Sequence, residues 1–124
     1  MKYLLFIFFL CFSFPGNFTF AAENEEIEYL LSFIAASDCV FIRNGTEHPP
    51  KEASEHLEMK YNHVKKRIKT ADVFIKKIAS KSSITRKKYQ VLCKGEKFPT
   101  EQWLEQALAS YRISAGHQEL KGEK

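Results

Sequence analysis

The first residues of the chain decide which part of it is available to form a folded domain. A short positive start is followed by an apolar run over residues 3–14, interrupted only by Ser13. A run of this length matches the core of a signal peptide and is too short to cross a bilayer. Small residues at Thr19 and Ala21 predict cleavage after Ala21. We therefore expect residues 1–21 to be a removable signal peptide that leaves no membrane anchor.

The remaining 103 residues, 22–124, suffice for one domain with one core and are too few for two. This part of the chain has two cysteines, Cys39 and Cys93, and an exported protein folds where thiols oxidise. We predict one disulfide between them, which would stabilise the fold by about 4 kcal/mol through loop closure. Because the pair lacks the Cys-x-x-Cys spacing, a structural role is favoured over a redox role.

Apolar residues of the mature chain alternate between helical and extended patterns. Steps of three and four, as in Ile27, Leu30 and Ile34, are typical of an amphipathic helix. Short β-branched and aromatic runs, such as residues 40–42, are typical of strands. The predicted fold class is α+β, a small mostly helical domain in the order α-β-α-α-β-α, with its helices packed on a two-stranded sheet joined by the disulfide. We expect helices over residues 23–36, 51–69, 70–80 and 99–113, strands over 39–43 and 89–93, and a frayed tail from about residue 114.

A series of short segments carries a resemblance to a known family. They are Phe41–Gly45, Ala53, His56-Leu57, Lys60, Arg67-Ile68, Thr70-Ala71, Phe74-Ile75 and Ala79–Thr85. Over roughly residues 27–112 the chain resembles the YfeK-like family of small bacterial exported proteins, a domain of unknown function. The resemblance implies a periplasmic protein of a Gram-negative bacterium and implies no activity.

The chain departs from the pattern of that family directly after Thr85. The family pattern looks like Gly-x-Pro-Tyr, whereas this chain has Arg86, Lys87, Lys88 and Tyr89. The glycine and proline that favour a turn are both replaced. We expect this loop either to keep its course with ordinary dihedral angles or to be looser and more basic.

Charge is distributed unevenly along the mature chain. Residues 23–59 have nine acidic and two basic side chains, net minus seven, whereas residues 60–97 have thirteen basic and two acidic side chains, net plus eleven. This contrast predicts an anionic partner for the basic middle third. The run at residues 86–88 has no interleaved aromatic residues, so we expect no nucleic acid. Acidic lipid headgroups or lipopolysaccharide phosphates are the expected envelope components.

Arg43 and Asn44 stand where the first predicted strand gives way to a turn at Gly45. An arginine in this position offers a fork of donors to a carboxylate or phosphate, which makes Arg43 the predicted anchor of a ligand. In the alternative interpretation, Arg43 pairs with an acid of the chain, and Asn44 and Gly45 are present because they tolerate a positive φ.

A basic stripe follows the second predicted helix, because His56, Lys60, His63 and Arg67 recur at steps of four, three and four. His56 and Lys60 are predicted ligand contacts, and a solvated flank whose stems cover the core is the alternative. His56 and His63 are two helical turns, about 10 Å, apart, which is too far for one metal ion without other ligands. We predict no metal site and no cofactor.

Hydroxyl groups are concentrated between the third predicted helix and the second strand. Ser82, Ser83 and Thr85 are predicted to contact an anion, and hydrogen bonds that end a helix or form a turn are the alternative. A serine hydrolase that uses this loop with His56 is a further alternative. We predict no catalytic residues, because the loop has neither a Gly-x-Ser-x-Gly nor a Ser-x-x-Lys motif.

These observations predict a non-enzymatic periplasmic module that binds an anionic partner through its basic middle third. The identity of that partner and the oligomeric state do not follow from the sequence. The main alternative is a protein-interaction module in which the acidic and basic segments pair between chains.

Overall fold

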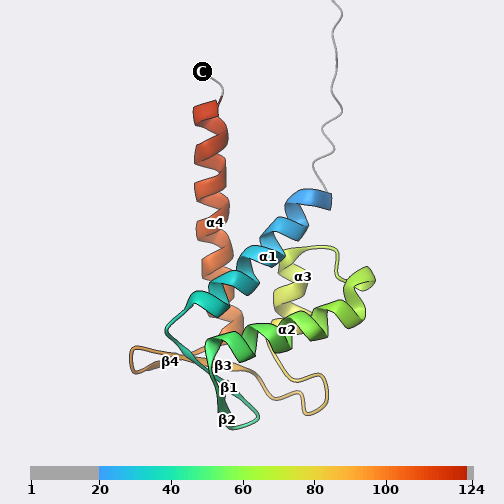
Figure 1. Ribbon diagram of the computed structural model, residues 1–124, viewed down its shortest axis with the longest axis vertical. Coiled ribbons are helices and arrows are strands. Elements are labelled where there is room, and N and C mark those ends of the chain that lie inside the picture. Colours follow the sequence, from blue (N-terminus) through green and yellow to red (C-terminus); the bar gives the residue numbers. More distant parts are fainter. Residues whose placement is uncertain (1–19, 123–124) are drawn as a thin grey trace, which may run out of the picture.

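The computed structural model describes the backbone of residues 20–122 and the side chains of residues 23–116. Helices make up most of the domain, and a small antiparallel sheet lies at one end of it (Figure 1). The helices are α1 (Phe20–Ala36), α2 (Pro50–Val64), α3 (Ala71–Phe74) and α4 (Thr100–Gly122), with a 3-10 turn η1 (Lys65–Arg67) and a π-helical turn η2 (Ile75–Ala79). The strands are β1 (Val40–Arg43), β2 (Thr46–His48), β3 (Gln90–Cys93) and β4 (Glu96–Pro99).

The predicted signal peptide lies outside the described residues except for the backbone of its last two. Phe20 and Ala21 form the first turn of α1. Within the described part of the chain, every helix is too short or too polar to span a bilayer.

Two hairpins lie side by side in the sheet, whose strand order is β2-β1-β3-β4. Each hairpin turns at a two-residue loop in which both φ angles are positive. These angles are 52° and 78° at Asn44 and Gly45, and 49° and 81° at Lys94 and Gly95. Positive φ at both positions is the mark of a type I′ turn, whose twist matches that of the flanking strands. The positive φ expected of Asn44 and Gly45 is thus confirmed.

The α+β class and the pairing of the two predicted strands are confirmed, but the sheet has four strands rather than two. β1 and β3 are adjacent and antiparallel, with Phe41 opposite Val91, and both side chains are buried. The two strands that the sequence did not predict are the edge strands β2 and β4. Most of their side chains are exposed, so they lack the apolar alternation that marks a strand. Backbone pairing across the type I′ turns holds them in the sheet.

Helix α2 ends at Val64 rather than near Lys69 as predicted. The chain then makes the η1 turn and redirects itself, which brings Ile68 into the core. Thr70 begins the next helix as predicted, because its Oγ1 accepts a hydrogen bond from the Val73 N–H at 3.1 Å. Arg67 therefore lies beyond α2, and the predicted basic stripe does not continue to it.

Helix α4 is longer than expected, because its backbone is helical to Gly122 and no frayed tail begins near residue 114. No proline follows Pro99, and the residues from Leu104 to Lys121 are mostly good helix formers. Two aromatic pairs, one stacked and one tilted, hold the first half of α4 against α1. The ring centroids of Tyr29 and Tyr111 are 4.3 Å apart, and those of Phe33 and Trp103 are 4.7 Å apart.

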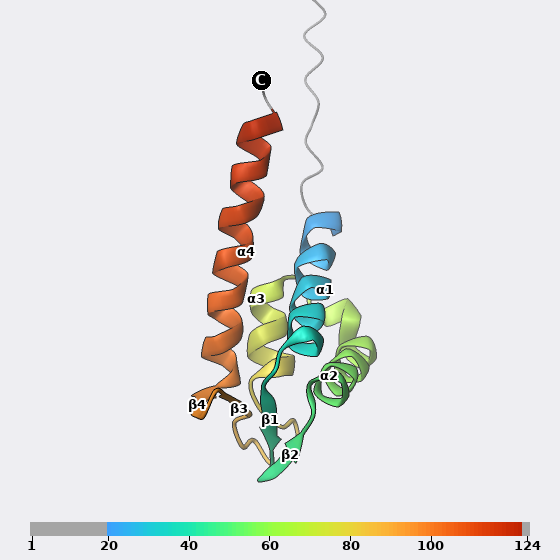
Figure 2. The ribbon, with the colours of Figure 1, turned by 60° about the vertical axis from the view of Figure 1, so that its left-hand side comes forward.

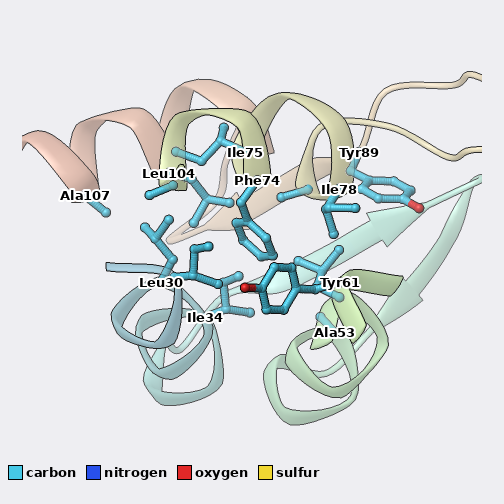
Figure 3. Packing of buried hydrophobic residues seen from close by; sticks show 14 of the residues in the cluster. Leu30, Ile34, Ala53, Tyr61, Phe74, Ile75, Ile78, Tyr89, Leu104 and Ala107 are labelled. Carbon is cyan, nitrogen blue, oxygen red and sulfur yellow. The ribbon is translucent and has the colours of Figure 1, made fainter. Parts of the chain in front are cut away.

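The core lies where α3 and η2 pack between the other three helices (Figures 2 and 3). Phe74 at its centre is fully buried and meets the ring of Tyr61 edge-on, with centroids 5.6 Å apart. Figure 3 shows side chains from every helix converging on this region. They include Leu30 and Ile34 of α1, Ala53 and Tyr61 of α2, Phe74 of α3, Ile75 and Ile78 of η2, and Leu104 and Ala107 of α4.

The predicted disulfide between Cys39 and Cys93 is present. Cys93 ends β3 and Cys39 directly precedes β1, and their Cα atoms are 4.6 Å apart. The bond therefore joins the two central strands of the sheet. Because 54 positions separate the cysteines in sequence, this bond closes a loop that contains α2, α3 and β2.

Candidate functional site

A small hollow lies where the sheet meets the first half of α2, and it gathers several polar side chains. Strand β1 supplies one wall with Phe41, Ile42 and Arg43, and α2 supplies the other with Ala53, His56 and Leu57. His48, Tyr89 and Thr100 complete the lining. The free volume is about 20 Å³, which is room for about one water molecule. Apolar atoms thus make up nearly all of the surface of the hollow, and one arginine and two histidines are among the residues that line it.

Arg43 is the principal charge at this hollow. Its side chain is half-buried, and no carboxylate among the described residues lies within ion-pair distance of its guanidinium. The alternative prediction that Arg43 pairs with an acid of its own chain is therefore wrong for the described part of the protein. The charge remains available to an external anion.

His56 lies across the hollow from β1. Its pKa is lowered from 6.5 to about 4, first by burial and then by the positive charges of Arg43 and Lys60, with a smaller effect of His48. At neutral pH His56 is therefore an uncharged imidazole. His48 lies 2.8 Å, Nδ1 to Oε1, from Glu52 in the first turn of α2, and this contact holds β2 against the helix.

Lys60 is built into the fold rather than presented to solvent. Its ammonium group donates hydrogen bonds to the carbonyl oxygens of Ile78 (2.8 Å) and Lys81 (3.1 Å) and to the hydroxyl of Tyr89 (3.1 Å). All three N–H donors are thereby used within the chain. Burial, followed by the charge of Arg43, lowers the pKa of Lys60 to about 8. Lys60 therefore positions the end of η2 and Tyr89, and it is not free to hold a ligand.

Thr100, the first residue of α4, lines the hollow and is fully buried. Its N–H donates to the Tyr89 carbonyl at 3.0 Å, but its Oγ1 has no hydrogen-bond partner among the described residues. A buried hydroxyl without a partner costs free energy, so this oxygen is suited to a water molecule or a ligand atom. The positive end of the α4 dipole adds to the positive potential there.

The serine loop is an ordered hairpin over residues 81–88, which we name the basic hairpin. The Ser82 N–H donates to the Lys87 carbonyl at 3.0 Å, and the Arg86 N–H donates to the Ser82 carbonyl at 3.1 Å. Lys81 and Lys88 form an isolated β-bridge at its base. The expectation of ordinary dihedral angles is wrong, since Arg86 has a φ of 63°. The expectation that the loop is looser than that of the family stays a prediction.

The hydroxyl groups of this region serve the structure of the loop. Ser80 Oγ donates to the Lys76 carbonyl at 2.6 Å and helps to end η2. Ser82 Oγ accepts from the backbone N–H groups of Ile84 and Thr85 at 3.3 and 3.2 Å. These are the helix-ending and turn-forming bonds that the alternative interpretation predicts. Ser83 is exposed at the tip.

The predicted site residues are brought into two neighbouring groups. Arg43 and His56 line the hollow, whereas Asn44 lies on the adjoining turn and reaches the basic hairpin. The Thr85 hydroxyl donates to Asn44 Oδ1 at 2.7 Å, which joins two residues 41 positions apart in sequence. Figure 1 shows the β1–β2 hairpin and this loop at the same end of the molecule, away from the C-terminal end of α4.

Three polar residues of the hollow were not predicted as site residues from the sequence, namely His48, Tyr89 and Thr100. Thr100 was correctly assigned to the start of a helix. Tyr89 was assigned to a strand, but β3 begins one residue later at Gln90. No sequence motif marks them, because the hollow forms only when β1, α2 and α4 meet. Within the described residues, no group of three or more His, Cys, Asp or Glu side chains is arranged to hold a metal ion.

The charge contrast of the sequence is reduced in the fold. Arg112 of α4 bonds to Glu26 of α1 at 2.6 Å and to Asp72 of α3 at 2.8 Å. Lys65 also lies beside the acidic face of α1, since it lines a surface hollow with Glu28. The acidic first third is thus partly neutralised by its own chain. By contrast, no basic side chain of the basic hairpin makes an ion pair within the described residues.

The fold and the site define a small disulfide-bonded α+β domain with a cationic hollow beside a basic hairpin. The chain belongs to the family of unknown function DUF5329, whose model matches residues 21–112. Among its relatives is the uncharacterized protein YfeK of Salmonella typhimurium strain LT2, which is 44% identical over 70 residues. That alignment covers 56% of this chain and 58% of the relative, and it confirms the resemblance that the sequence motifs predict. No solved structure matches the chain.

Proposed function

We propose that this protein is a non-enzymatic module of the periplasm that binds an anionic partner through its basic middle third. Arg43 is the proposed anchor of the ligand. The observation that carries this proposal is the half-buried guanidinium of Arg43, which has no acidic partner among the described residues. The work of desolvating such a cation is recovered when a carboxylate or phosphate binds to it.

Neighbouring groups extend the positive potential around Arg43. The pKa values of His56 and Lys60 are both lowered in part by the charge of Arg43, which shows that these groups lie within its field. The positive charge of Arg43 disfavours protonation of His56, and an anion bound to Arg43 would raise the pKa of His56 again. Thr100 also lines the hollow, and its buried hydroxyl has no hydrogen-bond partner among the described residues.

The size of the hollow limits which part of a ligand it accepts. Its free volume is about 20 Å³, so only a small group of the ligand enters while the remainder lies on the surface. A ligand that fits has one carboxylate or phosphate for Arg43 and a larger body that stays outside. This description suits a group exposed on a larger envelope component better than a cofactor enclosed by the protein.

The arrangement supports binding better than hydrolysis. A serine nucleophile needs a base within hydrogen-bonding distance, and no hydrogen bond joins His56 to Ser82 or Ser83 in the described structure. Ser82 accepts two backbone N–H bonds that form the turn. With a pKa of about 4, His56 is also a weak base at neutral pH.

A thermal-shift titration of the processed protein tests this proposal. The probes are inorganic phosphate, an acidic sugar and a simple dicarboxylate, each at low and at high salt. A ligand near 100 times its dissociation constant adds about 2.7 kcal/mol of stability, which raises the melting temperature by about 10 °C or more in a domain of this size. We expect at least one anion to stabilise the protein and the effect to weaken with salt.

Two arginine variants separate specific binding from general charge. Arg43→Gln removes the proposed anchor, whereas Arg67→Gln removes an exposed arginine beyond the other end of α2 and serves as the matched control. We expect the first variant to lose the stabilisation and the second to keep it. Equal responses of the two variants, or no stabilisation by any anion, would contradict the proposal.

A further inference from the structure

The tip of the basic hairpin presents an apolar side chain to solvent. Ile84 is 93% exposed and is the most exposed large hydrophobic residue of the described chain. The hairpin that holds it is ordered, since backbone hydrogen bonds close it and the Thr85 hydroxyl bonds to Asn44 of the β1–β2 turn at 2.7 Å. Ile84 is thus held in an exposed position by a defined structure.

Basic side chains lie along the hairpin that carries this apolar tip. Arg86, Lys87 and Lys88 are exposed on one strand of the hairpin, and Lys81 is half-buried on the other. The hairpin has no acidic residue. The neighbouring β1–β2 hairpin has one acidic residue, Glu47, which is exposed. A short hairpin with four cations and one exposed apolar side chain is complementary to a negatively charged interface with an apolar interior.

Arg86 adds a second indication that the cations of this hairpin have a role. Its φ of 63° lies in the left-handed region, where a side chain is disfavoured and glycine is favoured. The loop therefore holds a long cationic side chain at a position where local backbone preference favours glycine. Strain of this kind is often found at binding sites.

We propose that the basic hairpin docks onto the surface of an anionic lipid bilayer. Ile84 enters the headgroup layer, while Lys81, Arg86, Lys87 and Lys88 contact lipid phosphates. A soluble anion satisfies the cations but offers nothing to Ile84, whereas a bilayer surface accommodates both kinds of side chain. Each lysine or arginine near an anionic membrane strengthens binding by about fivefold.

This inference rests on the proposed function, because it names the anionic partner of one part of the basic middle third. The two are tested separately, since the hollow at Arg43 is probed with soluble anions and the hairpin with vesicles. If Arg43→Gln abolishes stabilisation by soluble anions but leaves vesicle binding unchanged, both proposals stand as separate sites.

Sedimentation of the processed protein with lipid vesicles tests the docking surface. The vesicles are pure phosphatidylcholine and an equal mixture of phosphatidylcholine and phosphatidylglycerol. We expect binding to the mixed vesicles alone and a marked loss of binding at high salt. Replacement of both Lys87 and Lys88 by Gln should weaken it about 25-fold.

A matched pair of isoleucine variants tests the apolar contact. Ile84→Ser should weaken binding to the mixed vesicles by about fivefold or more. The control is Ile113→Ser on α4, because Ile113 is also an exposed isoleucine, at 64%, and should have no effect. Both side chains face solvent, so neither change should disturb the fold.

Three results would overturn the inference. The first is no binding to the mixed vesicles, and the second is equal binding by Ile84→Ser and the parent protein. The third is displacement of the protein from vesicles by inorganic phosphate at matched ionic strength, because it would assign the hairpin to a soluble phosphate ligand.

Discussion

Reduction of the Cys39–Cys93 disulfide should lower the free energy of unfolding substantially. The bond joins residues 54 positions apart, and closing a loop of that length removes conformational entropy from the unfolded chain worth about 4 kcal/mol. In a domain of about 100 residues this loss corresponds to a melting temperature lower by about 20 °C. Because the total stability of small domains is commonly about 5–15 kcal/mol, this loss is between about a quarter and most of the free energy of unfolding.

Urea unfolding of the oxidised and reduced protein measures this difference directly. Reduction leaves both side chains in place, so the comparison isolates the covalent link from packing at Cys39, which is buried. We expect a lower midpoint after reduction and a larger dependence on urea, since the unlinked chain exposes more surface when it unfolds. A Cys39→Ala and Cys93→Ala double variant should behave like the reduced protein.

Two outcomes would refute this reasoning. One is the recovery of two free thiols from the unfolded, unreduced protein. The other is a free energy of unfolding that changes by less than about 1 kcal/mol on reduction, which would mean that the unfolded chain is already restricted without the bond.

Two further predictions concern single side chains near the proposed binding surfaces. Arg86→Gly should leave the free energy of unfolding in urea unchanged or raise it by up to about 1 kcal/mol, because glycine favours the positive φ at this position. A free energy of unfolding that falls by more than about 1 kcal/mol would show instead that the Arg86 side chain stabilises the fold. His56 has a pKa lowered from 6.5 to about 4 in the folded protein, so the unfolded chain takes up the proton first and stability falls as the pH drops from 6.5 to 4. Because His56 is half-exposed, solvent screening limits this loss of stability to about 1 kcal/mol. Urea unfolding curves between pH 7 and pH 4 should therefore show a smaller fall in stability for His56→Gln than for the parent protein. The same pH dependence of stability in both proteins would contradict the lowered pKa of His56.

Prediction from the sequence succeeded where a residue's role depends on its near neighbours or on one strong chemical constraint. The apolar steps of α1, the cap at Thr70 and the positive φ at Gly45 are local features. The disulfide was predictable because residues 22–124 have two cysteines, and the predicted signal peptide favours their oxidation. The edge strands β2 and β4 were not predicted because they are defined by backbone pairing with a neighbouring strand. The pattern of apolar residues in the sequence contains no information about that pairing.

The candidate site was predicted only in part, for a related reason. Arg43 and His56 were identified by their chemistry, and the fold places both at the hollow. Lys60 was identified on the same grounds, yet its donors are used by the ends of η2 and the basic hairpin. Whether a cation is free or engaged depends on the carbonyl groups that the fold brings to it, and these come from residues 18 and 21 positions away.

The sequence by itself determined the α+β class, the Cys39–Cys93 disulfide and the basic middle third of the chain. These properties follow from composition, spacing and the number of cysteines, which do not depend on the arrangement of the elements in space. Only the tertiary structure decided which charges remain unpaired. It neutralises part of the acidic segment through Arg112, uses Lys60 internally, and leaves Arg43 and the basic hairpin without acidic partners in the described residues. The physical reason is that an ion pair or a hydrogen bond forms only when its two groups come within a few ångströms, and those distances are set by packing between residues far apart in sequence.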